Sequence, residues 1–185
     1  MTDRCERDRS LVAGDGPMRW SSFETRRLGT LFMAYVDLCP FFVSLGRPQE
    51  VRDWAQARGL VPLAWDDSAP RALQDVAQAV VDGGGPYEGP IGFVRETVFQ
   101  RAVLAATCTI ARGETRTYGE IAQAIGRPRA ARAVGSALAA NPLPLLIPCH
   151  RVVGAGRRLG YYSDGGPEMK RRLLTWEDVD IACWR

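Results

Sequence analysis

The sequence predicts a small α/β domain followed by a helical domain that contains a helix-turn-helix. Runs rich in aromatic and β-branched residues come first, between residues 26 and 47, and two helical patterns follow them. Residues 83–92 (GGGPYEGPIG) then gather glycine and proline, as linkers do. Beyond them, apolar residues recur at helical spacing. A chain of 185 residues, 46% of them apolar, is large enough to form two small cores.

The first domain is expected at residues 21–85, after a tail at residues 1–20 whose charged, aperiodic sequence indicates mobility. A break at Cys39-Pro40 separates two strand-like runs, and a proline begins each of the two helical patterns. The expected elements are strands at 26–37 and 41–47, helices at 48–57 and 70–81, and a linker at 86–92.

The second domain is expected at residues 93–185. Its first helix is expected to bury an apolar stripe at residues 98–106, and two shorter helices flank a Gly-containing turn, which is the outline of a helix-turn-helix. The second of these carries small residues and arginines, so its backbone can approach phosphates closely. Tight packing of a small-residue helix against its neighbour is the alternative. The expected helices are 93–111, 118–125, 129–140 and 167–176, and three prolines make residues 141–153 a buried extended segment.

Composition excludes several kinds of site. The chain has one histidine, His150, and five cysteines without any C-x-x-C pair, so neither a multi-histidine site nor a structural zinc site is expected. Scattered cysteines also predict free thiols in a reducing compartment. No run approaches the roughly 18 to 20 apolar residues of a membrane span, and the opening MTDRCERDRS is unlike a signal peptide. We therefore expect a cytoplasmic protein without a membrane partner.

The charge is unevenly distributed along the chain. Residues 93–172 hold thirteen basic and five acidic residues, a balance of +8, although the whole chain carries only +3. A basic module joined to an acidic one predicts a polyanionic partner for the former.

Cys149 is the candidate nucleophile, because it lies beside the only histidine of the chain. The thiolate is the reactive form of cysteine, and an imidazole can take its proton. Neighbouring side chains on an extended segment point to opposite faces, so we expect the two groups to communicate through a water molecule. Cys5, Cys39, Cys108 and Cys183 are expected to be small apolar residues without a catalytic role.

These motifs together resemble one family. IPCHRVV at residues 147–153, after TYGEIAQAIGRPRAARAVGSALAANP and before LGYYS and KRRLL, closely resembles the O6-alkylguanine-DNA alkyltransferases. The resemblance covers residues 93–177 and extends loosely to residues 24–90. It implies a small α/β domain joined to an all-α DNA-binding domain. It also implies DNA repair by direct reversal, in which one cysteine permanently accepts the alkyl group of O6-alkylguanine, and of O4-alkylthymine, without a cofactor.

The resemblance assigns roles to individual residues. It implies that Cys149 accepts the alkyl group, that His150 acts as the base through water, and that Glu177 orients His150. Asn141 would tie the site to the recognition helix, Tyr118 would support base rotation and protonate the leaving guanine, and Arg132 would replace the extruded base in the stack. The remaining implied contacts are Arg129, Ala133, Gly135 and Arg151 with DNA, and Pro144, Tyr162 and Ser163 with the guanine. The partner implied is double-stranded DNA, bound through its minor groove by a monomer, with cooperative binding left open.

The sequence departs from the family pattern near the pocket. One additional residue separates Tyr162 from the lysine of the following helix, which puts Asp164 on the expected pocket loop. Its carboxylate is expected either to repel DNA phosphates or restrict the alkyl group, or to point outward into solvent. Because of the insertion, Glu168 and Asp178 compete with Glu177 as the partner of His150. The zinc of some relatives is not expected.

Two other functions compete with repair. A lesion-binding relative that recruits other repair factors would lack the acceptor thiol, so the presence of Cys149 argues against it. A helix-turn-helix regulator with a redox-sensing cysteine would need an effector domain or a second cysteine near residue 149, and the sequence has neither.

Overall fold

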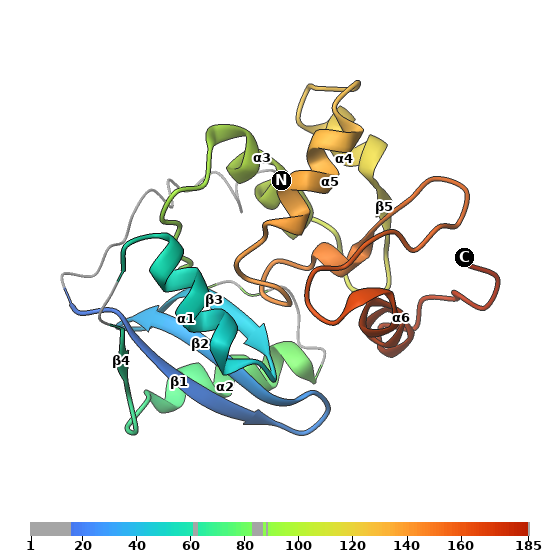
Figure 1. The fold of residues 1–185 in the computed structure, drawn as a ribbon. Coiled ribbons are helices and arrows are strands. Elements are labelled where there is room, and N and C mark those ends of the chain that lie inside the picture. The colour runs from blue at the N-terminus through green and yellow to red at the C-terminus, as the bar shows by residue number, and fades with distance from the viewer. Residues whose placement is uncertain (1–15, 61–62, 83–86, 88, 185) are drawn as a thin grey trace. The chain divides into compact units, whose positions relative to one another are not determined.

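The computed structural model describes residues 16–60, 63–82, 87 and 89–184 (Figure 1). The chain divides into two compact units between Arg95 and Glu96. Most of the expected tail, residues 1–15, lies outside the described residues, as do residues 86 and 88 of the expected linker. Arg19 and Trp20, which were assigned to the tail, instead begin the first strand.

The first unit is built on a four-stranded sheet. Strands β1 and β2 pair antiparallel, β2 and β3 pair antiparallel, and β4 joins β1 in parallel, so the order is β3-β2-β1-β4. The strands are β1 (Arg19–Thr25), β2 (Gly29–Val36), β3 (Cys39–Leu45) and β4 (Ala64–Trp65). The sequence interpretation missed β1 and β4, and it placed the break between β2 and β3 two residues late. The turn lies at Asp37, whose φ is 52°, and Pro40 is tolerated inside β3 because β3 is an edge strand.

Two helices complete the first unit. Helix α1 (Pro48–Ala57) has the predicted bounds, and α2 (Arg71–Val81) begins after Pro70, which serves as its N-cap. Helix α1 buries Val51 and Trp54 in a core cluster with Trp20 and Phe41 from the sheet. Stacking of Phe42 on Trp54, with ring centroids 5.0 Å apart, adds to this packing.

A buried polar network links β1, β2 and the segment after β4 in the first unit. The Tyr35 hydroxyl donates a 2.8 Å hydrogen bond to the Asp66 carboxylate, and the Ser21 hydroxyl donates to the Asp66 carbonyl at 2.7 Å. Burial, together with the hydrogen bond to Asp66, raises the pKa of Tyr35. Because β1, β2 and the segment after β4 all contribute to it, the network fixes β4 at the edge of the sheet.

The second unit is helical apart from one short strand pair. Strand β5 (Arg116–Thr117) pairs in parallel with β6 (Val152–Val153), which brings the start of α4 beside the end of the Cys149 turn. The helices are α3 (Val98–Cys108), α4 (Tyr118–Ala124), α5 (Ala131–Ala139) and α6 (Gly166–Trp176), with a 3₁₀ turn, η1, at Cys149–Arg151. No helix among the described residues is long and apolar enough to cross a lipid bilayer.

Capping explains where α3 and α4 begin. Thr97 and Gln100 form a capping box, so α3 begins at Val98 rather than at residue 93, and Val98 is 87% exposed instead of buried. Thr117 and Glu120 form the same motif at the start of α4. Helix α4 therefore begins at Tyr118 as predicted, with the tyrosine held in the first turn.

The proline-rich segment at residues 141–148 is buried throughout, as predicted, but it does not remain extended to Cys149. Arg151 N donates to Pro148 O, which closes the η1 turn. The expectation that Cys149 and His150 lie on an extended strand is therefore wrong. A single tight turn carries Cys149, His150 and Arg151.

Candidate active site

Cys149 is held in place by the side chain of Asn141. The Asn141 amide nitrogen donates to the Cys149 sulfur and to the Ile147 carbonyl, both at 3.1 Å, while its oxygen accepts from Leu143 N. The Asn141 amide thus closes the loop at residues 141–149 and holds Cys149 in position. Cys149 is 5% exposed.

His150 forms a buried pair with Glu177, at the end of α6. Its Nε2 lies 3.0 Å from Glu177 Oε1, and Glu168 and Asp178, the competing carboxylates, are exposed. Burial acts to raise the pKa of Glu177, but hydrogen bonds from His150 and Arg151 outweigh it and lower the pKa to about 2, so Glu177 is a carboxylate. Nε2 therefore carries the proton and Nδ1 is an acceptor. Burial lowers the pKa of His150, which keeps the ring neutral, and Nδ1 has no hydrogen-bond partner among the described residues.

Arg151 is buried rather than exposed on the surface, which contradicts the expectation that it contacts DNA. Its side chain is buried, and it donates to both oxygens of Glu177 at 2.8 and 2.9 Å and to the Ile110 carbonyl at 2.7 Å. The physical reason is the η1 turn, which directs this arginine inward toward the carboxylate. Arg151 therefore supplies the positive charge that keeps Glu177 ionised inside the protein.

Lys170 on α6 is a site residue that the sequence interpretation missed, although it begins the KRRLL motif. It is fully buried, and its Nζ donates to Val152 O at 2.6 Å and to Tyr161 O at 3.4 Å. Nζ also lies 5.8 Å from the centroid of the Tyr118 ring. Burial lowers the pKa of Lys170 to about 8, and the nearby Cys149 acts against this shift. A lysine in a predicted helix gives no local signal that it will be buried.

Burial raises the pKa of Cys149 above the ordinary value for a thiol. The hydrogen bond from Asn141 and the charge of Lys170 act in the opposite direction, and the Asp164 carboxylate adds to the rise. Asp164 is itself 5% exposed, so of the two alternatives left open for it, the outward-pointing loop charge is wrong. In the resting protein the proton stays on sulfur, and a base is needed to remove it.

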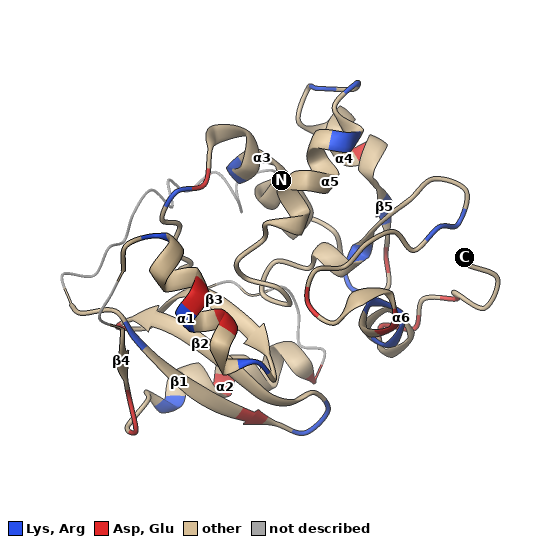
Figure 2. Cartoon of the chain, in the orientation of Figure 1, with Lys and Arg blue, Asp and Glu red and all other residues tan. Residues whose placement is uncertain are grey.

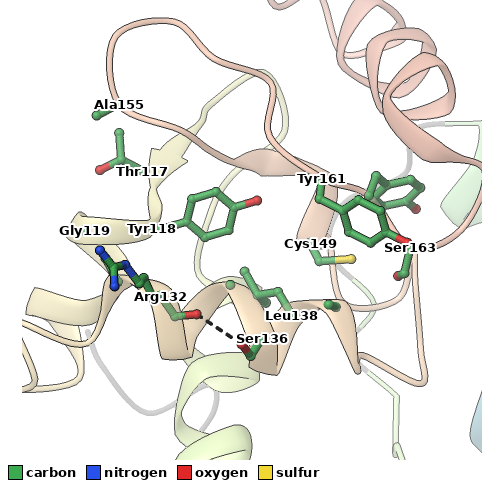
Figure 3. Close-up of a pocket in the computed structure, with 14 residues that line it drawn as sticks. Thr117, Tyr118, Gly119, Arg132, Ser136, Leu138, Cys149, Ala155, Tyr161 and Ser163 are labelled. Carbon is green, nitrogen blue, oxygen red and sulfur yellow. Dashed lines mark hydrogen bonds between the residues drawn. The ribbon is translucent and has the colours of Figure 1, made fainter.

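A cavity of about 700 Å³ opens onto Cys149 (Figure 3). Its walls come from the start of α4, from α5, from the loop at Ala155 and from the loop before α6. In Figure 3, Tyr118 lies between Arg132 on one side and Cys149 on the other, and Tyr161 and Ser163 lie beyond Cys149. The cavity therefore extends from an exposed arginine to a buried thiol.

Glycines make room for Tyr118 inside this cavity. A Cβ at Gly160 would lie 2.8 Å from the Tyr118 hydroxyl, and the φ of Gly160 is 73°. A Cβ at Gly135 would be in ordinary contact with the same ring, at 3.8 Å. Burial, followed by the charge of Cys149, raises the pKa of Tyr118, so its phenol keeps its proton. Gly160 was not singled out from the sequence, since only its contact with Tyr118 reveals its role.

Comparisons with known proteins show which family the chain belongs to. A family model described as "6-O-methylguanine DNA methyltransferase, DNA binding domain" matches residues 98–179. The inducible methylated-DNA–protein-cysteine methyltransferase of Bacillus subtilis is 37% identical over 140 residues, which cover 74% of this chain and 77% of that protein. This chain belongs to the methylated-DNA–protein-cysteine methyltransferase family.

Other members of the methyltransferase family match over different lengths. The Mycobacterium bovis protein of this name is 54% identical over 84 residues, so the matched part spans 45% of this chain and 50% of that relative. The crystal structure of Mycobacterium tuberculosis OGT in complex with DNA covers 89% of this chain and 97% of its own, with a TM-score of 0.73 and 32% identity. The fold predicted from the sequence, an N-terminal α/β domain and a helical C-terminal domain, is confirmed.

The methyltransferase motif residues fall into three groups in this chain. Tyr118, Arg132, Gly135, Cys149, Tyr162 and Ser163 line the cavity. Asn141, His150 and Glu177 are buried: Asn141 donates to the Cys149 sulfur, and His150 pairs with Glu177. Pro144 is buried but does not line the cavity, and Arg129 and Ala133 are exposed outside it. Within the described residues, no group of three or more His, Cys, Asp and Glu side chains could hold a metal ion.

Proposed function

We propose that this protein repairs alkylated DNA by moving the alkyl group of O6-alkylguanine onto Cys149, once per molecule. The observation that carries the proposal is a buried thiol at the end of a cavity, backed by a neutral histidine and an ionised glutamate. O4-alkylthymine, which presents the same kind of alkyl–oxygen bond, is proposed as a second substrate.

The reaction begins with removal of the thiol proton. His150 Nδ1 is the acceptor left available by the Glu177 hydrogen bond, and a water molecule carries the proton from the Cys149 sulfur to it. Glu177 then stabilises the imidazolium, as the acid of a hydrolytic triad does. The thiolate attacks the alkyl carbon in line, the new S–C bond forms, and the C–O6 bond breaks with its electrons moving to the guanine.

Tyr118 is proposed to protonate the departing guanine. Its raised pKa means that the phenol arrives with its proton, and Figure 3 shows its hydroxyl on the side facing Cys149. Lys170, close to the Tyr118 ring, then stabilises the phenolate, and the phenol regains a proton from solvent. The guanine leaves in its ordinary neutral form. Tyr162 and Ser163 are proposed to contact the guanine within the cavity.

The target base must leave the duplex to reach this thiol, because Cys149 is 5% exposed. Arg132 lies at the exposed end of the same cavity, on a helix whose other residues outside the core are small, and is proposed to fill the gap in the base stack. Arg129, Ala133 and Gly135 lie on or beside this helix and are proposed to approach the minor groove. The groove's degenerate pattern suits a protein that searches for lesions irrespective of sequence.

Mass spectrometry tests the proposal directly. After incubation with duplex DNA containing O6-methylguanine, the intact protein is expected to gain one methyl group, and peptide masses are expected to locate it at Cys149. The Cys149→Ala variant is expected to gain none. Cys183→Ala, which removes an exposed free thiol, is the matched control and should react like the wild type. Full DNA binding by the wild type without any mass gain would instead indicate a lesion-binding protein.

A further inference from the structure

A second basic element lies at the wall of the cavity, outside the helix-turn-helix. Residues 154–158, here called the 154–158 turn, follow directly after β6 and carry Arg157 and Arg158. Figure 2 shows basic residues both between α4 and α5 and on the loop that follows the Cys149 turn. The alkyl-transfer chemistry itself requires no arginine at this place.

The 154–158 turn has a defined conformation. Gly154 N donates to Arg158 O at 2.7 Å, and the two residues form an antiparallel bridge. A Cβ at Gly154 would lie 2.9 Å from Arg158 Cβ, so glycine is required for this close approach. Arg157 adopts a φ of 59°, which costs free energy in any residue other than glycine. The turn thus holds an arginine in a strained conformation at its tip.

The turn is also anchored to the site. Val152 and Val153 are buried before it and Leu159 is buried after it, whereas residues 155–158 are all exposed. Strand β6 pairs with β5, so the turn starts beside the N-terminus of α4. Ala155 lines the same cavity as Arg132 and Cys149. The buried residues on either side therefore hold the turn in place, and its two arginines are exposed at the wall of the cavity.

Both arginines are available for an external anion. Within the described part of the chain, neither side chain forms a hydrogen bond or an ion pair, whereas the nearby Arg116 pairs with Glu114 at 3.4 Å. Exposed arginines without carboxylate partners among the described residues also occur just before and within α5, at Arg127, Arg129 and Arg132, of which Arg132 lines the cavity. A cavity that receives a base from duplex DNA is flanked on both sides by backbone phosphates.

We propose that the 154–158 turn is a second DNA-binding element, in which Arg157 and Arg158 bind backbone phosphates across the cavity from Arg132 on α5. Together the two elements hold the duplex over the cavity from both sides. The inference rests on the proposed function, since it takes DNA as the partner. It adds a contact surface outside the helix-turn-helix and sets the position of the duplex relative to Cys149.

Salt-dependent binding to an unmodified duplex tests this element separately from the chemistry. For the Arg157→Ala/Arg158→Ala variant, the slope of log affinity against log salt is expected to fall in magnitude by about 1.8, or about 0.9 for each phosphate that the variant no longer neutralises. Affinity near 0.15 M salt should fall by roughly 5- to 30-fold. The rate of reaction with free O6-benzylguanine, which has no phosphates, should stay within about twofold of the wild-type rate.

The matched control is Arg171→Ala/Arg172→Ala, which removes the same charge from α6, a helix that does not line the cavity. An unchanged slope in the 154–158 variant, or an equal change in the control pair, would overturn the proposal. If wild-type protein binds DNA with the expected slope but gains no methyl group, the alkyl-transfer proposal fails while the DNA-binding element stands.

Discussion

Lys170 is expected to control how easily the Cys149 thiol ionises, because its buried charge lies close to the sulfur. Replacing it with glutamine should raise the pKa of Cys149 further, and alkyl transfer at neutral pH should slow about tenfold for every pH unit by which that pKa rises. In the wild type, the rate should stop rising near pH 8, where Lys170 loses its proton. The rate of Lys170→Gln should continue to rise there.

Reaction with free O6-benzylguanine between pH 6 and 10 provides the measurement. Arg171→Gln, on the next residue of α6, is the control and should keep the wild-type profile. A Lys170→Gln profile that matches the wild type in shape would show that the lysine only fills space.

Glu177 is expected to stabilise the fold as well as the base. Glu177→Gln leaves the buried Arg151 guanidinium without a compensating charge, so the free energy of unfolding should fall by about 3–5 kcal/mol. Because folding depresses its pKa from 4.5 to about 2, the contribution of Glu177 is complete above pH 4.5 and is lost as the pH falls toward 2.

Urea unfolding at pH 7 and at intervals down to pH 2 measures both effects. Asp178→Asn, which removes the adjacent exposed carboxylate, should change neither the stability at pH 7 nor its loss in acid. Equal stability of Glu177→Gln and the wild type at pH 7 would contradict the buried ion pair.

Single residues were predictable from the sequence where motif order fixes them, as for Cys149 and His150. Arg151, Asp164 and Lys170 were not, because whether a charged side chain is buried depends on partners far along the chain. Arg151 meets Glu177 and Ile110, and neither pairing leaves a local pattern.

At the scale of the element, the exposed face of α5 that carries Arg132 is expected to act only on duplex substrates. Arg132→Ala should slow repair of O6-methylguanine in duplex DNA by roughly tenfold or more, because extruding a base costs a few kcal/mol. It should leave the reaction with free O6-benzylguanine unchanged. Single-turnover rates on the two substrates give the comparison, and Arg172→Ala is the control. An equal loss of rate on both substrates would mean that Arg132 supports the pocket instead.

Element boundaries followed local chemistry wherever a cap or a proline set them. Pro48 begins α1, and Thr117 caps α4 one residue before the predicted Tyr118. The strands were harder to predict: β1 has polar residues at Ser21, Ser22 and Glu24, and its pairing with β2 becomes evident only in the sheet. The two residues of β4 are too few to form a periodic pattern.

At the scale of the whole molecule, the two units are expected to separate stability from chemistry. Tyr35→Phe removes one of several hydrogen-bond donors to the buried Asp66 carboxylate and should lower the free energy of unfolding of the first unit by about 1–3 kcal/mol. All the site residues described above lie in the second unit, so the rate with free O6-benzylguanine at 25 °C should not change. Unfolding followed by tryptophan fluorescence and the single-turnover rate test the two halves of this expectation. A slower reaction in folded Tyr35→Phe would contradict it.

The two-part organisation was readable from the sequence because glycine and proline concentrate between two differently patterned halves. The assembled site was only partly readable. Its members come from the start of α4, the Cys149 turn and the end of α6, and only the folded chain brings Glu177 to His150.

The Asn141 amide has a consequence for the life of the molecule after reaction. It donates to the Cys149 sulfur in a buried position, and a thioether in that place is bulkier than the thiol of the resting protein. A methyl group that extends into the cavity has room, whereas one that turns toward the packed side of Cys149, against Asn141, typically costs about 1–3 kcal/mol. The spent protein would therefore carry a physical mark of its single use, a looser loop at residues 141–149, by which used and unused molecules differ without any further chemistry.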